Sequence, residues 1–318
     1  MMHLFKISKE DKRINLLETV NLFLLLSLSG LNFFNDNDNF LFFVCCINLI
    51  VFFFKKEKVD NGFFVFFLFF IVLSIAQTIW FSDGNFKSTV GFFLRILTAY
   101  LVIKNCSNFL TSFLRLLFFL SLVSIFCYAF FLIFPSIEDA LFVNKHFWDN
   151  PATSEFKKSL IVYNIFREPL FGTDALGLFG LPRNSGPFWE PGAFGGYLTI
   201  GIALEMILFR KFSPRVFVLL IALATTFSTA GYVSTAVFFL LYFLFLETNK
   251  KKKLLIFPAL LVGSFFLIAD VDFLAGKITG QIEGFKESQT YKMQSDDDTR
   301  LGSTRLDLND FQRSPLFG

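Results

Sequence analysis

Apolar residues along this chain gather in long runs that carry few charges. About 20 such residues let a helix cross a hydrocarbon core of about 30 Å, where helices satisfy their own backbone hydrogen bonds. We therefore predict an all-α integral membrane protein, a polytopic bundle of about nine transmembrane helices. The predicted spans are 15–34, 40–54, 62–81, 88–104, 112–134, 192–210, 214–228, 230–247 and 254–269.

The polar stretches between these spans predict four parts of the chain. They are N-terminal transmembrane helices at 1–134, a first long loop at 135–191, C-terminal transmembrane helices at 192–269 and a second long loop at 270–318. Loops longer than about 15 residues are uncommon unless they are functional or disordered. Both loops contain apolar and aromatic residues, which predicts short interfacial helices within them.

Basic residues alternate between the short connections. The N-terminal segment 6–13 and the connections at 55–58 and 104–115 carry lysine or arginine, whereas NDNDN at 35–39 carries neither. Cytoplasmic connections of membrane proteins are enriched in these residues. The alternation predicts a cytoplasmic N-terminus and two long loops on the extracytoplasmic side.

Residues 214–247 are apolar almost throughout. As a single helix they would extend about 50 Å, which is too long for a bilayer. Basic clusters at 210–215 and 250–253 flank both ends, so an even number of crossings is needed to keep both clusters in the cytoplasm. We expect a helical hairpin that turns near 228–231; the alternative is one tilted helix with four lysines outside.

Composition narrows the classes of function. The net charge of +3 is too small to indicate a nucleic-acid partner. His3 and His146 are isolated, which predicts neither a metal site nor a metal cofactor. The cysteines lie in or beside apolar runs, which argues against a disulfide framework; they are Cys45, Cys46, Cys106 and Cys127.

The segment RNSGPFWEPGAFGGYL at 183–198 joins the first loop to an apolar run. Pro191 suits the first turn of a helix, and Glu190 before it is an anion where the helix dipole favours one. Trp189 is typical of a membrane interface. With Arg183 nearby, the segment predicts a site for a lipid diphosphate; the alternative is that these residues only start, anchor and pack a helix.

Small and charged residues inside the spans suggest how the helices pack. Gly192 and Gly196 are four apart, which predicts a face that another helix approaches closely. Arg95 is near the middle of its span, where a charge usually faces the protein interior. Glu18 and Glu205 are near cytoplasmic ends, so we expect their side chains to reach toward water.

The second loop ends in a segment rich in arginine. A short helix capped by Ser303 or Thr304 is predicted before Pro315. Arginine suits phosphate because its planar fork donates two hydrogen bonds and keeps its charge. Candidate anion ligands here are Arg300, Arg305 and Arg313; the alternative is that they solvate a loop.

Three segments, in this order, resemble the bacterial O-antigen polymerases (Wzy type) and the related O-antigen ligases. They are RNSGPFWEPG at 183–192, FSTAGYVSTAVFFLLYF at 227–243, and Arg305 followed by SPLFG at 314–318. Ala230 departs from the family, in which an arginine is frequent at that position. The resemblance covers nearly the whole chain and implies the polytopic fold predicted above.

The resemblance implies a glycosyltransferase that uses no cofactor. A polysaccharide on undecaprenyl diphosphate is transferred to the next lipid-linked repeat unit at the outer face of the bacterial inner membrane. Arg183 and Arg305 would stabilise the diphosphate leaving group, and Glu190 would accept the proton of the attacking hydroxyl. These three are the candidate catalytic residues. The candidate substrate-binding residues are Trp189, Arg300 and Arg313.

The implied partners are undecaprenyl-diphosphate-linked glycans and the lipid bilayer, with a chain-length regulator and a flippase of the same pathway. In the family the second loop usually continues past SPLFG and returns to the membrane. We therefore expect this sequence to be truncated.

Two other functions fit parts of the pattern. An O-antigen ligase would transfer finished polymer to a lipid A core, but the ligases tend to use a histidine in the second loop and 270–318 contains none. A flippase or other transporter would place more charges at mid-membrane than Arg95 alone. A non-catalytic assembly partner of the same pathway is a further alternative.

The predicted orientation can be tested by labelling single cysteines in a cysteine-free background. Leu160→Cys and Thr290→Cys should react with a membrane-impermeant maleimide added to intact cells, whereas Lys252→Cys should react only after the cells are lysed. Labelling of position 252 in intact cells would contradict both the hairpin and the orientation.

Overall fold

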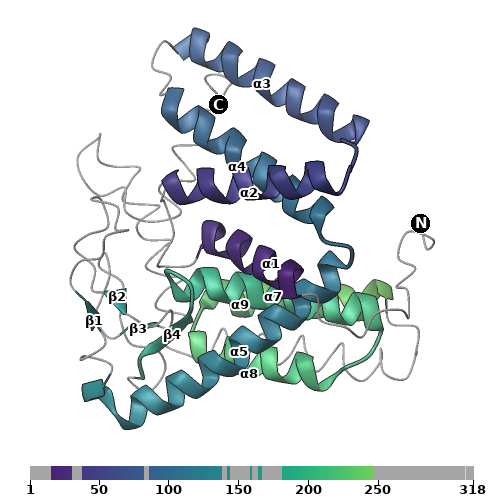
Figure 1. Ribbon diagram of the computed structural model, residues 1–318. Helices are drawn as coiled ribbons and strands as arrows, with labels where there is room; N and C mark the ends of the chain where they lie inside the picture. The colour runs from purple at the N-terminus through teal and green to yellow at the C-terminus, as the bar shows by residue number, and fades with distance from the viewer. Residues whose placement is uncertain are drawn as a thin grey trace. The chain divides into compact units, whose positions relative to one another are not determined.

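The computed structural model describes residues 16–30, 38–81, 86–137, 142–143, 158–159, 164–166, 181–246 and 312. This part of the chain is mostly helical (Figure 1). The helices are α1 (Leu16–Ser29), α2 (Asp38–Phe54), α3 (Asn61–Phe81), α4 (Phe86–Asn105), α5 (Phe109–Ile133), α7 (Pro191–Phe209), α8 (Pro214–Thr226) and α9 (Thr229–Leu241), the last followed by a π-helical turn at Tyr242–Leu246.

The chain divides into two compact units. The first contains residues 1–166 and 183–231, and the second contains 167–182 and 232–318. Helices α1 to α8 belong to the first unit, as do the first three residues of α9. In the second unit, the rings of Phe238 and Tyr242 lie 5.9 Å apart along α9 and its π-helical turn.

Helices occupy most of the predicted spans. Each predicted span from 15–34 to 230–247 overlaps one described helix, and the span at 254–269 lies outside the described residues. Among the described residues, three helices are long and apolar enough to cross a membrane: Phe109–Ile133, Pro191–Phe209 and Thr229–Leu246. Helices α1, α2 and α8 are apolar but shorter. Three such helices in one chain indicate a multi-pass membrane protein.

The long apolar stretch from 214 onward is two helices, as predicted, and the single tilted helix is wrong. Helix α8 ends at Thr226, and Phe227 adopts the left-handed conformation with φ of 45°. A methyl group on Gly231 would lie 3.0 Å from Leu223 Cδ1, one turn before the end of α8. The helix is therefore interrupted at 227–228, close to the predicted turn at 228–231.

Helix α5 contacts α1, α7 and α8 in the first unit, and α4 lies between α2 and α3 (Figure 1). Phe63 of α3 stacks on Tyr100 of α4 with ring centres 3.6 Å apart. In a membrane, close packing and polar bonds rather than exclusion of water hold such helices together. Leucines with no more than 1% exposure form the centre of this packing: Leu22, Leu114, Leu117, Leu198 and Leu219.

Three buried asparagines join α1, α2 and α4. The amides of Asn21 and Asn48 exchange two hydrogen bonds, at 2.7 and 3.1 Å. Asn105 Nδ2 donates to the backbone oxygen of Asn48 at 3.0 Å and to its Oδ1 at 3.1 Å. Because unpaired amides are costly in an apolar interior, these bonds fix how the three helices pack.

The prediction that Gly196 lies on the closely packed face of α7 was wrong by one residue. A methyl group on Gly196 would meet no atom within 4 Å, whereas one on Gly195 would lie 3.2 Å from Ser228 Cβ and 3.5 Å from Gly231 Cα. Gly201 makes the second close approach of α7, where an added methyl would overlap the side chain of Leu117 on α5. Gly195 and Gly201 are six apart, so they serve two different neighbours.

Three expectations about charged side chains were also wrong. Glu18 is 6% exposed and accepts hydrogen bonds from Ser107 N and Oγ at 3.2 and 2.9 Å. Glu205 is 2% exposed and accepts one from Ser213 Oγ at 2.9 Å. The other oxygen of Glu205, Oε2, lies 3.7 Å from Arg215 Nη1. Both carboxylates thus have partners within the protein and do not reach toward water. Arg95, expected to face the interior, is exposed on α4.

We expected short helices in the first loop; its described parts contain a helical segment at 135–137 and four short strands. β1 (Phe142–Val143) pairs antiparallel with β2 (Lys158–Ser159), and β3 (Asn164–Phe166) pairs antiparallel with β4 (Arg183–Gly186). The β3–β4 pairing contains an irregularity between Asn164 and Ile165. Arg183, eight residues before the start of α7, begins β4. This strand contacts α5, α7 and α8.

The packing at Gly195 gives a matched test. Gly195→Val should destabilise the protein by about 1–3 kcal/mol, because the added methyls press on Ser228 and Gly231. Gly196→Val introduces the same side chain into open space and should change stability much less. Thermal unfolding of the detergent-solubilised variants measures both; equal losses of stability would contradict the assigned register.

Candidate functional site

The site begins at the turn that links β4 to α7. The amide of Gly186 donates to Asn184 Oδ1 at 2.8 Å, and Phe188 N donates to Ser185 O at 3.1 Å. Gly186 has φ of +55°, and a methyl group there would lie 2.7 Å from the Phe194 ring. The turn therefore requires glycine for both its backbone angle and its space.

Asn184 is the residue at this site that sequence reasoning missed. It is 2% exposed. Its Oδ1 accepts a bond from Ser124 Oγ of α5 at 3.0 Å, and its Nδ2 donates to Thr225 Oγ1 of α8 at 2.9 Å. One side chain thus ties β4 to two helices. An asparagine beside glycine and proline predicts only a turn, so the sequence holds no signal for these distant partners.

Arg183 lies at the end of α8. Its Nε donates to the backbone oxygen of Thr226, the last residue of that helix, at 3.4 Å. The last carbonyls of a helix lack partners within it and carry the negative end of its dipole, so a cation is favoured there. A guanidinium has five N–H donors, and this bond is compatible with further bonds to a phosphate oxygen.

Trp189 and Phe188 attach the turn to the end of α1. The amide of Trp189 donates to Gly30 O at 3.0 Å, while its side chain is 45% exposed. The ring of Phe188 is fully buried and stacks on Phe194 and Tyr197, with ring centres 5.5 and 4.6 Å apart. An exposed indole on a firmly held backbone suits an interfacial anchor.

Glu190 occupies the N-cap position of α7, with Pro191 in the first turn. The backbone of Glu190 is extended, with φ of −145°. Its backbone oxygen accepts a hydrogen bond from the amide of Phe194 at 3.2 Å. The carboxylate itself makes no capping hydrogen bond. Helix capping therefore does not account for this side chain, although the helix dipole still favours its charge.

The starts of α7 and α9 lie side by side. Gly195 in the second turn of α7 is next to Ser228 and Gly231, and Ser228 Oγ caps α9 by accepting the amide of Gly231 at 3.2 Å. Helix starts carry the positive ends of their dipoles and unpaired N–H groups. The buried Oγ1 of Thr229 has no hydrogen-bond partner among the described residues. Two helix starts and the Arg183 guanidinium thus bring positive charge to this region, beside the negative end of α8.

The second-loop arginines Arg300, Arg305 and Arg313 lie outside the described residues. Their predicted contribution to this site stays a prediction. Within the described residues, no group of three or more His, Cys, Asp or Glu side chains is placed to hold a metal ion.

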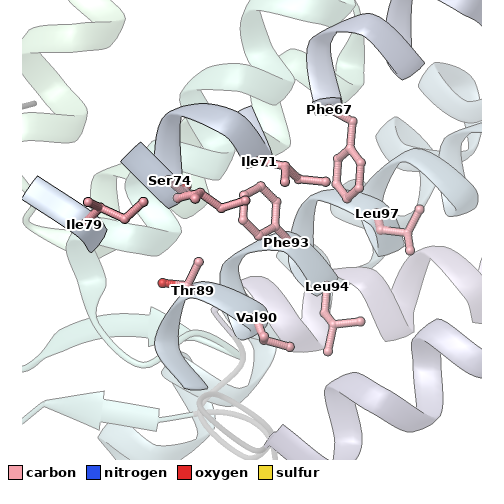
Figure 2. Close-up of a pocket in the computed structure, with 10 residues that line it drawn as sticks. Phe67, Ile71, Ser74, Ile79, Thr89, Val90, Phe93, Leu94 and Leu97 are labelled. Atoms are coloured by element: carbon pink, nitrogen blue, oxygen red, sulfur yellow. The ribbon is translucent and has the colours of Figure 1, made fainter. Parts of the chain in front are cut away.

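A separate apolar groove lies between α3 and α4 (Figure 2). Its volume is about 430 Å³, and Ser74 and Thr89 are the lining residues that carry hydroxyl groups. The remaining lining side chains are apolar, among them Phe67, Ile71, Phe93, Leu94 and Leu97. None of the predicted site residues lines it, so it has no place in the predicted chemistry.

Comparison of the chain with models of protein families, with curated proteins and with solved structures gives no match. Any assignment of function therefore rests on the motifs and on the arrangement of the residues described above.

The role of the turn glycine can be tested directly. Gly186→Ala should destabilise the protein by more than about 1 kcal/mol, because alanine both strains the left-handed backbone and overlaps Phe194. Gly62→Ala in α3 is the control, since a methyl group there meets nothing within 4 Å. A melting temperature unchanged by Gly186→Ala would show that this turn is not the constraint inferred here.

Proposed function

We propose that this chain is a membrane glycosyltransferase of the O-antigen polymerase type. It would join undecaprenyl-diphosphate-linked repeat units into O-antigen or a related surface polysaccharide. The observation that carries the proposal is the position of Arg183 and Glu190, which flank the turn leading into α7. Arg183 donates to the last residue of α8, and Gly195 in the second turn of α7 lies beside the start of α9.

The proposed topology is a bundle of about nine transmembrane helices in the bacterial inner membrane, with a cytoplasmic N-terminus. Arg210, Lys211 and Arg215 cluster at the α7–α8 connection, at the opposite end of α7 from Glu190. The preference of basic connections for the cytoplasm then puts Glu190 and the two long loops on the extracytoplasmic side. The lipid-linked sugars would be polymerised on that side.

The electrostatics of the α7–α9 region suit a diphosphate. Departure of undecaprenyl diphosphate develops negative charge on the leaving oxygen, and fixed cations or dipoles near that oxygen lower the barrier. Arg183 supplies a guanidinium, and the starts of α7 and α9 supply partial positive charge. Arg300 and Arg305 of the second loop are proposed to add to it, Arg313 to bind the substrate, and Trp189 to hold the site at the membrane surface.

In the proposed reaction, the hydroxyl oxygen of the incoming lipid-linked sugar forms a bond to the anomeric carbon of the growing chain. The bond from that carbon to the diphosphate oxygen breaks, and undecaprenyl diphosphate leaves. Glu190 is proposed to take the hydroxyl proton. A flippase would supply the lipid-linked unit, and a chain-length regulator would act on the product.

The proposed diphosphate ligand is tested by Arg183→Ala in a strain that lacks the chromosomal copy. Losing a fork that donates to a dianion should cost about 2–4 kcal/mol, or roughly 30- to 1,000-fold in rate. On a gel, the lipopolysaccharide should then show single repeats in place of the ladder of chain lengths that polymer gives. The protein should still accumulate in the membrane. Arg183→Lys should restore the ladder partly, because lysine keeps the charge without the fork.

Arg167→Ala is the control for this experiment, because Arg167 belongs to the same loop but not to the motif. Its ladder should be nearly intact. If Arg183→Ala gives a normal ladder at normal protein level, the proposed function at this site is wrong. The segment would then have only its structural role of starting and anchoring α7.

Glu190→Gln separates a catalytic carboxylate from a structural one. A general base contributes about 10²- to 10⁴-fold to a rate, so the amide should reduce polymer to single repeats. Because glutamine has nearly the same shape as glutamate and the side chain does not cap α7, the melting temperature should fall little. A full ladder from Glu190→Gln would remove Glu190 from the proposed mechanism while leaving the role of Arg183 open to its own test.

A further inference from the structure

We propose that Asn184 is a positioning residue that holds the Arg183 guanidinium at the end of α8 for the diphosphate. This inference rests on the proposed function, because it takes Arg183 as the diphosphate ligand. Asn184 need not touch the substrate: it is 2% exposed, and its side-chain hydrogen bonds reach α5, α8 and its own turn.

Two adjacent residues of β4 form hydrogen bonds with two adjacent residues at the end of α8. Asn184 Nδ2 donates to Thr225 Oγ1 at 2.9 Å, and Arg183 Nε donates to Thr226 O at 3.4 Å. The first bond is short and joins two side chains, whereas the second is long. The amide bond therefore sets the distance between strand and helix end, and the guanidinium follows it.

Asn184 Oδ1 fixes the same strand from two other sides. It accepts Ser124 Oγ of α5 at 3.0 Å and the amide of Gly186 at 2.8 Å. Ser124 is 1% exposed, so water cannot replace the lost partner if Asn184 is truncated. The amide thus locates Arg183 relative to α5, α8 and the turn into α7 at once.

The positioning role is tested better by removing a partner of Asn184 than by truncating Asn184 itself. Asn184→Ala leaves buried groups on α5, α8 and the turn without partners, and it risks failing to fold. Ser124→Ala removes one bond to Asn184 from outside the strand and leaves the turn bond in place. Ser121→Ala is the matched control: it removes a hydroxyl that is equally buried on α5, one turn away, and that donates only to Leu117 O of its own helix.

The experiment measures binding of geranylgeranyl diphosphate to the full chain in lipid nanodiscs. Arg183→Ala should weaken binding about 30-fold or more, and Ser124→Ala about 5- to 10-fold, the scale of one hydrogen bond. Ser121→Ala should leave binding unchanged. In the Arg183→Ala background, Ser124→Ala should weaken binding no further, because its effect passes through the guanidinium. The melting temperature of each variant reports folding separately.

Two results would overturn the positioning role alone: an equal loss from Ser124→Ala with and without Arg183, or equal losses from Ser124→Ala and Ser121→Ala. Either would mean that the hydroxyl supports the bundle in general. Binding that Arg183→Ala does not weaken would overturn the proposed diphosphate site, and the positioning role with it.

Discussion

The close approach of α7 to the start of α9 is the contact on which the rest of the site depends. Gly195 lets the capping residue Ser228 and the backbone of Gly231 come within van der Waals reach. A side chain at 195 would press on Ser228, the residue that caps α9 just after the end of α8. The aromatic stack of Phe188 on Phe194 and Tyr197 then seats the preceding turn on α7, and Gly186 lets it bend there.

The local sequence pattern predicted the helices well, because apolar runs and basic flanks depend only on the residues of each segment. The break between α8 and α9 followed from length alone, since 214–247 is too long for one crossing. The position of Trp189, Glu190 and Pro191 at the start of α7 also followed from local chemistry, through helix-capping and interfacial preferences.

What the sequence left undetermined depends on partners far along the chain. A four-residue spacing of glycines does not say which face meets a neighbour, so Gly196 was chosen where Gly195 packs. Glu18 and Glu205 were expected to reach water because Ser107 and Ser213, which donate hydrogen bonds to them, lie in connections that carry no motif. Asn184 was missed for the same reason: its partners are 60 and 41 residues away.

The asparagine cluster has a consequence for biogenesis. Asn21 and Asn48 can pair as soon as α1 and α2 have both left the ribosome, since synthesis delivers the N-terminal helices first. Asn48 Oδ1, which accepts a hydrogen bond from Asn105, stays available for that bond until α4 arrives. An amide without a partner in the lipid favours the first helix that offers one. The order of translation would therefore favour α1 with α2, and only then α4, over other pairings of these apolar helices.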